Sequence, residues 1–77
     1  MRSGDPLGVL RNRLWRMRKR HDHIDASLRS DRSGWTLEFS RNDQPLLTWR
    51  FATEEAARAE AAARRRELER AGWTSHW

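Results

Sequence analysis

Residues 35–51, WTLEFSRNDQPLLTWRF, decide the fold. Apolar side chains occupy alternate positions on both sides of a polar centre, residues 41–45, which is rich in turn-forming residues. Side chains two positions apart lie on the same face of a β-strand, so this stretch predicts a β-hairpin with one apolar face. Folding the hairpin about Asp43 pairs apolar residues throughout: Phe39 with Leu47, Leu37 with Trp49, and Trp35 with Phe51.

A third alternating segment precedes this hairpin. Ile24, Ala26 and Leu28 share one face, and residues 30–34, SDRSG, have the composition of a turn. The expected register places nine apolar side chains on one side of a three-stranded antiparallel meander over residues 23–52, and a slip by one residue would expose them all. In this register three pairs face each other across the first turn: Leu28 with Trp35, Ala26 with Leu37, and Ile24 with Phe39.

A basic amphipathic helix is predicted before the sheet, over residues 6–20. Asp5 is a good N-cap and Pro6 is favoured at the first helical position. Four apolar residues recur at helical spacing and form one stripe, while cations occupy the other side. The stripe consists of Leu7, Leu10, Leu14 and Met17.

A second helix is predicted after the sheet, over residues 53–71. Thr53 is a good N-cap, and Gly72 is typical of a left-handed helix end that sets Trp73 against Leu68. An alanine-rich stripe is expected to face the sheet: Ala57, Ala61, Leu68 and Ala71. The fold class is therefore α+β with the order α-β-β-β-α, in a single domain over residues 1–77 with a tail at 72–77.

Charge is unevenly distributed along the chain, whose net charge is +5. Residues 1–20 hold 7 basic residues against 1 acidic residue, a difference of +6, and residues 21–77 hold 9 against 10, a difference of −1. A basic segment attached to a nearly neutral body is typical of proteins with an anionic partner. The cations at residues 64–66 are expected to be compensated by Glu60, Glu67 and Glu69 on the same helix.

Composition excludes several classes of protein. The chain has no Cys, which removes disulfides and thiolate chemistry and fits a reducing compartment. Its apolar runs are too short for a membrane span, and its start lacks the pattern of a secretory signal. We therefore expect a cytoplasmic protein.

Nucleic acid is the leading predicted partner. The basic helix would contact phosphates with little sequence specificity, and Trp15 would stack on a base. The residues predicted to bind nucleic acid are Arg11, Arg13, Trp15, Arg16, Lys19 and Arg20.

A protein partner is the alternative. The apolar stripe of the first helix would then dock on another protein or on a second copy in a homodimer, while the terminal Trp either packs on the core or meets the partner. The residues that would form this surface are Leu7, Leu10, Leu14, Trp15, Met17 and Trp77.

No metal, cofactor or small-molecule site is predicted. His21, His23 and Asp25 share a strand face, with Glu38 expected opposite Asp25, which is a weak arrangement for a metal or for acid–base catalysis. An open strand face offers no pocket, so we expect solvated side chains and no enzyme. Arg29 and Arg50 are expected to pair with the two carboxylates.

The predicted order resembles that of the double-stranded-RNA-binding domain. The resemblance rests on residues 35–39, WTLEF, and on the step into an alanine-rich helix at Glu55-Ala56-Ala57. In that family lysines at the start of the last helix contact phosphates, whereas here the matching positions are Glu54, Glu55 and Arg58. Residues 51–56, FATEEA, also resemble the arm-binding domains of phage integrases. These resemblances imply that the chain binds nucleic acid, although it lacks the lysine cluster with which the double-stranded-RNA-binding domain contacts phosphates.

Overall fold

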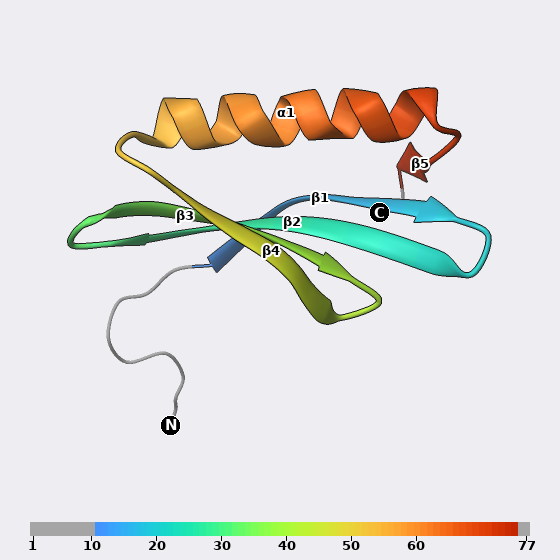
Figure 1. The fold of residues 1–77 in the computed structure, drawn as a ribbon, viewed down its shortest axis with the longest axis horizontal. Coiled ribbons are helices and arrows are strands. Elements are labelled where there is room, and N and C mark those ends of the chain that lie inside the picture. The colour runs from blue at the N-terminus through green and yellow to red at the C-terminus, as the bar shows by residue number, and fades with distance from the viewer. Residues whose placement is uncertain (1–10, 76–77) are drawn as a thin grey trace.

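The computed structural model describes residues 11–75. Four long strands follow one another and are closed by one helix and a short strand (Figure 1). Within residues 11–75 no helix is both long and apolar enough to cross a membrane. The elements are β1 (Arg11–Lys19), β2 (Asp22–Asp31), β3 (Gly34–Arg41), β4 (Gln44–Phe51), α1 (Glu54–Arg70) and β5 (Thr74–Ser75).

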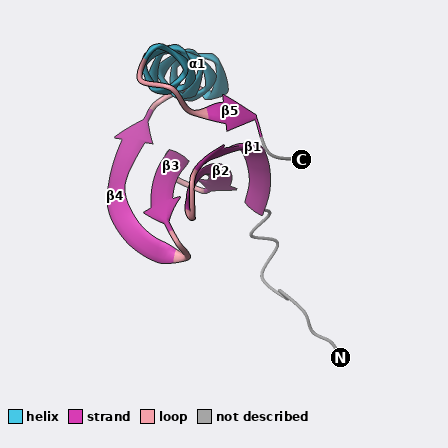
Figure 2. Ribbon diagram, turned by 90° about the vertical axis from the view of Figure 1, so that its right-hand side faces the viewer, coloured by secondary structure: helices cyan, strands magenta, loops and turns pink. Residues whose placement is uncertain are grey.

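The sheet has five antiparallel strands in the order β4-β3-β2-β1-β5. The prediction of a three-stranded meander after a basic helix is therefore wrong, because residues 11–19 form strand β1 instead. Residues 6–10 of the predicted helix lie outside the described part. The strands curl around a core that α1 covers from one side (Figure 2), so the molecule has two layers.

Strand β1 alternates between core and solvent. Trp15 and Met17 face the core and are 3% and 0% exposed, whereas Arg16 reaches Asp25 on the opposite face of the sheet. A β-bulge between Arg13 and Trp15 shifts the register and turns Leu14 toward the core as well. Burial of the Trp15 indole and the Met17 thioether under α1 stabilises the strand. This gain in free energy is larger than the intrinsic preference of Arg, Leu and Lys for a helix.

The register predicted for the second hairpin is confirmed. Its central pairs are Phe39 with Leu47, Leu37 with Trp49, and Trp35 with Phe51. The two-residue turn between β3 and β4 pairs Arg41 with Gln44, and a β-bulge at the Phe39/Ser40 step then shifts the register by one residue to give these pairs. Asn42 and Asp43 both have positive φ, 52° and 68°, as a type I′ turn requires, and Asn and Asp tolerate this conformation best among non-glycine residues.

The register predicted for the β2–β3 hairpin is wrong by two residues. Leu28 lies opposite Leu37 rather than Trp35, and Asp31 lies opposite Gly34. The prediction placed the turn at residues 30–34, whereas the chain makes a two-residue turn at 32–33, in which the Asp31 carboxylate accepts the backbone N–H of Ser33 at 2.9 Å. A shift of two positions preserves the face of every side chain.

The predicted ends of α1 are confirmed. The Thr53 hydroxyl accepts the N–H of Ala56 at 3.1 Å. At the other end the Trp73 N–H donates to the Leu68 carbonyl and the Gly72 N–H donates to the Glu69 carbonyl, which is the pair of bonds of a Schellman motif. Trp73 and Leu68 pack against the core.

The small residues of α1 let the helix lie close to the sheet. Ala57 and Ala61 on its sheet-facing side are fully buried, as predicted. Ala71, which was also predicted to face the sheet, is the C-cap and is exposed. The Trp15 indole N–H donates to the Ala61 carbonyl at 3.0 Å, so this buried residue of β1 also fixes the helix.

Candidate functional site

The sheet and its turns carry all the net charge of the described chain. Residues 11–53 hold 10 basic and 5 acidic side chains, a difference of +5, whereas α1 holds 5 of each. Ion pairs within the helix account for its neutrality, and they include the predicted compensation of the 64–66 run. They are Arg58–Glu54, Arg64–Glu60, Arg64–Glu67 and Arg65–Glu69.

The sheet face opposite α1, here named the outer face, is polar. Ser27, Ser40 and Thr48 lie on it among arginines. A hollow of about 370 Å³ on this face is lined by Arg13, Asp25, Ser27, Ser40 and Asp43.

A buried carboxylate organises this hollow. Asp25 is only 8% exposed, and its two oxygens accept Nε and Nη2 of Arg16 at 2.7 and 3.2 Å. Arg13 Nε lies 3.8 Å from the same carboxylate. The hydrogen bond with Asp25 raises the pKa of the Arg16 guanidinium above its usual value. The predicted partners of Asp25, Arg29 and Arg50, are not the ones that bind it.

Arg50 instead fixes the β2–β3 turn. Its guanidinium lies 3.3 Å from the Asp31 carboxylate and donates to the Thr36 hydroxyl at 2.9 Å. The Arg50 hydrogen bond, helped by Ser33, lowers the pKa of Asp31 to about 2.

A third carboxylate, Asp22, links the ends of the other two hairpins. Hydrogen bonds from Asn42 and Arg41, both at 3.0 Å, lower the pKa of Asp22. The bonds join the β1–β2 end to the β3–β4 turn.

Three of the residues predicted to bind nucleic acid are exposed or reach the outer face. Arg13 and Arg16 lie beside Asp25, and Arg20 is exposed in the β1–β2 turn with φ 57°. Arg11 starts β1, and its side chain is outside the described part of the structure.

The other two have structural roles. The Lys19 ammonium donates to the Ala71 carbonyl at the end of α1, at 2.8 Å. Trp15 is buried, so the expectation that it stacks on a base is wrong.

The alternative surface on an apolar helical stripe does not exist as predicted. Met17 and Trp15 belong to the core, and Leu14 is half-buried against it. The strand alternation of β1 hides the side chains that a helix would have exposed. Leu7, Leu10 and Trp77 lie outside residues 11–75.

The predicted cluster of His21, His23, Asp25 and Glu38 is not brought together. Glu38 pairs with Ser27 rather than Asp25, because of the two-residue shift in register. His23 Nε2 lies 3.8 Å from Asp43. Among residues 11–75, no three His, Cys, Asp or Glu side chains are grouped as a metal would need.

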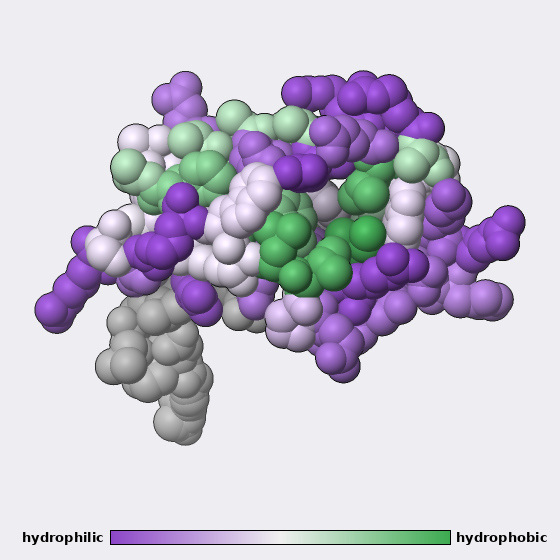
Figure 3. Space-filling view, viewed as in Figure 1, coloured by the Kyte–Doolittle hydropathy of each residue, from purple (hydrophilic) through white to green (hydrophobic). Residues whose placement is uncertain are grey.

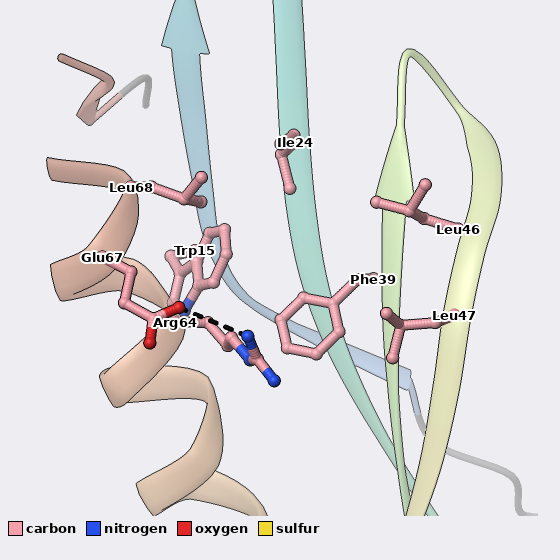
Figure 4. Close-up of a pocket in the computed structure, with 8 residues that line it drawn as sticks. All are labelled: Trp15, Ile24, Phe39, Leu46, Leu47, Arg64, Glu67 and Leu68. Atoms are coloured by element: carbon pink, nitrogen blue, oxygen red, sulfur yellow. Dashed lines mark hydrogen bonds and ion pairs between the residues drawn. The ribbon is translucent and has the colours of Figure 1, made fainter. Parts of the chain in front are cut away.

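Two features were missed by sequence reasoning. Arg18 alternates with apolar residues on β1 and makes no ion pair with the described residues, and neither does Arg29, which was expected to pair with a carboxylate. The period of two on β1 was the available signal for Arg18. The second feature is an apolar pocket between β4 and α1 (Figure 4), for which the uncharged run at residues 44–49 was the available signal.

These features define a small α+β domain with a basic, polar sheet face. Comparison with protein-family models, with curated proteins and with solved structures returns no match. The resemblances to double-stranded-RNA-binding and integrase arm-binding domains therefore remain predictions.

Proposed function

We propose that this protein is a non-enzymatic module that binds nucleic acid through phosphates, using the outer face of the sheet and the adjoining β1–β2 turn. The observation that carries the proposal is the separation of charge between the two layers. The sheet and turns hold a surplus of five positive charges, while α1 is neutral. If the positive charge served solubility alone, it would be expected on both layers rather than on the sheet only.

The surplus includes guanidinium groups that have no carboxylate partner within the described chain. Arg18 and Arg29 lie on the solvent side of β1 and β2, and Arg20 is exposed at the turn. Guanidinium groups bind phosphate oxygens through paired N–H donors. Ser27, Ser40 and other hydroxyls between the cations add donors of the kind that position a nucleic-acid backbone.

The central carboxylate does not oppose this function. A bare Asp25 would repel phosphate, but Arg16 and Arg13 lie beside it and offset its charge. With Asp43 included, two cations face two carboxylates, so the hollow carries no net negative charge. The pair of hydrogen bonds from Arg16 also holds that guanidinium in a fixed position on the face. The arrangement supports contacts to a backbone rather than reading of base edges.

Binding to labelled duplex DNA and duplex RNA, followed by fluorescence anisotropy, tests the proposal. With about four phosphate contacts, the affinity should fall about 100-fold between about 50 and 200 mM salt. An Arg18→Gln/Arg20→Asn variant should lower the slope of log affinity against log salt by about 2. Asn suits the positive φ of position 20.

The matched control is Arg66→Gln/Arg70→Gln on the helix, which removes the same charge from exposed positions. It should leave the salt slope close to that of the wild type. Asp43→Asn should increase affinity at every salt concentration, because it removes an exposed negative charge from the hollow and leaves the Arg16–Asp25 pair intact. Absence of binding at about 50 mM salt, or equal losses in both double variants, would refute the proposal. Preference between DNA and RNA follows from the same titrations.

A further inference from the structure

The exposed large hydrophobic residues of the described chain lie together on β4. Leu46 is 55% exposed and Leu47 is 39% exposed. Hydrophobic side chains gather on the face that carries β4, between polar surfaces (Figure 3). In a domain whose hydrophobic core is small, leaving two adjacent leucines in water costs stability that burial would recover.

A pocket opens beside these leucines, between β4 and the second half of α1. Its volume is about 170 Å³. Leu46 and Leu47 form one wall, Phe39 lies behind, and Leu68 and Arg64 lie on the helix side (Figure 4). Dry apolar cavities of about 150 Å³ hold a molecule the size of benzene, so this one has room for one large apolar side chain.

The same strand offers an unpaired edge. β4 is the terminal strand of the sheet, and no strand among residues 11–75 pairs with its outer side. Pro45 and a bulge opposite the Phe39/Ser40 step interrupt only the first part of the strand. From Leu47 to Phe51 the edge carries apolar side chains, Thr48 and the single charged residue Arg50.

Charge on this side of the molecule is neutralised internally. Arg50 pairs with Asp31 at 3.3 Å, and Arg64 pairs with Glu60 at 2.9 Å while its guanidinium stacks over Trp49 at 4.8 Å. A strongly acidic partner would find no unpaired cation here. A neutral, apolar surface matches a second surface of the same kind, and the chain itself provides one.

We propose that two copies of this chain pair through β4, antiparallel and about a two-fold axis near Thr48. Apolar side chains of each copy then fill the pocket beside β4 of the other copy. In this register Leu47 of one copy lies beside Trp49 of the other on the core-facing side. Each β4 gains the partner that its free edge lacks, and the interface is self-complementary, as a two-fold dimer requires.

The pairing is compatible with the high net charge. It joins the two sheets through β4 and leaves the two basic β1 strands far apart, seven strand spacings from each other, which is roughly 34 Å in a flat sheet. This separation is several times the Debye length of about 8 Å at physiological salt. The β4 edge is therefore the edge at which two copies repel each other least.

Sedimentation equilibrium of the full chain, from about 1 µM to 1 mM, tests the proposal. The wild type should reach twice the mass of one chain. A Leu46→Glu/Leu47→Glu variant should raise the dissociation constant at least 100-fold. The matched control, Ala59→Glu/Ala62→Glu, adds the same charge at exposed helix positions and should still dimerise. Circular dichroism establishes that each variant is folded.

A second measurement does not depend on the leucine variant folding. The chain has no cysteine, so Thr48→Cys places one thiol near the proposed axis and Ser75→Cys places one on the far edge. Oxidation should link the first variant into a dimer much faster than the second. A monomeric wild type at every concentration, a folded leucine variant that still dimerises, or equal cross-linking at both positions would overturn self-pairing. A monomer would mean that a different partner covers the surface or that none does.

Discussion

Replacing Trp15 with Phe tests whether this residue joins the two layers of the fold. Its indole is 3% exposed, and its N–H donates to the Ala61 carbonyl at 3.0 Å. Phe keeps an aromatic ring but loses that bond, which contributes about 1 kcal/mol. It also removes two buried ring carbons, which contribute about 1.6 kcal/mol at about 0.8 kcal/mol each. The free energy of unfolding should fall by roughly 2–3 kcal/mol.

Urea unfolding followed by far-UV circular dichroism measures this loss in the free energy of unfolding. The same loss corresponds to a fall in the melting temperature of roughly 10–20 °C for a chain of this size. Trp49→Phe is the control, because Trp49 is half-buried on β4 and stacks with Arg64. It should cost less than about 1 kcal/mol. A Trp15→Phe variant within about 0.5 kcal/mol of the wild type, or one no worse than the control, would refute the role assigned to Trp15.

Two further variants test the turns that set the sheet register. Gly34→Ala should destabilise by about 1–3 kcal/mol, because φ is +143° and a Cβ would lie 2.7 Å from the Phe51 carbonyl oxygen; in thermal melts Gly72→Ala, which meets only the flexible Lys19 side chain, should lose less. The pKa of Asp31 is lowered to about 2 in the folded protein, so its stabilising effect is present above the unfolded pKa near 3.9 and is lost as pH falls toward 2. Asp31→Asn should therefore flatten the decline of the melting temperature between about pH 4 and 2, and an unchanged decline would contradict the assignment.

The sequence predicted the central hairpin, the helix ends and the alanine contact with the sheet, because each depends on local rules. Alternation of Trp35 to Phe51 fixes which face is buried, and Thr53 and Gly72 act within one turn of the helix. The β2–β3 register was wrong because alternation determines the face of a side chain but leaves shifts of two residues open. The two-residue turn that pairs Asp31 with Gly34 determines which of these registers forms.

Strand β1 was the main error, and its cause is physical. Leu7, Leu10, Leu14 and Met17 fit a helical period, and Arg, Leu and Lys favour helices. The alternation that marks a strand spans only Trp15 to Arg18, since the bulge before Trp15 turns Leu14 inward. Local propensity could not reveal that Trp15 would fill the core under Ala61, 46 residues away in the chain. Tertiary packing therefore decided the conformation.

One proposed surface is the outer face of the sheet with the β1–β2 turn and the other is the β4 edge, so the two can act together. Antiparallel pairing of β4 about a two-fold axis turns both outer faces toward the same side, because the axis runs perpendicular to the sheet. Two copies would thus present Arg18 and Arg29 twice to one nucleic acid, and the second contact would benefit from a raised effective concentration. Affinity should then rise steeply with duplex length for the wild type. It should rise much less for the Leu46→Glu/Leu47→Glu variant, whose single outer face is unchanged. If affinity depends on duplex length equally in the two proteins, the two surfaces do not act together and the basic face binds by itself.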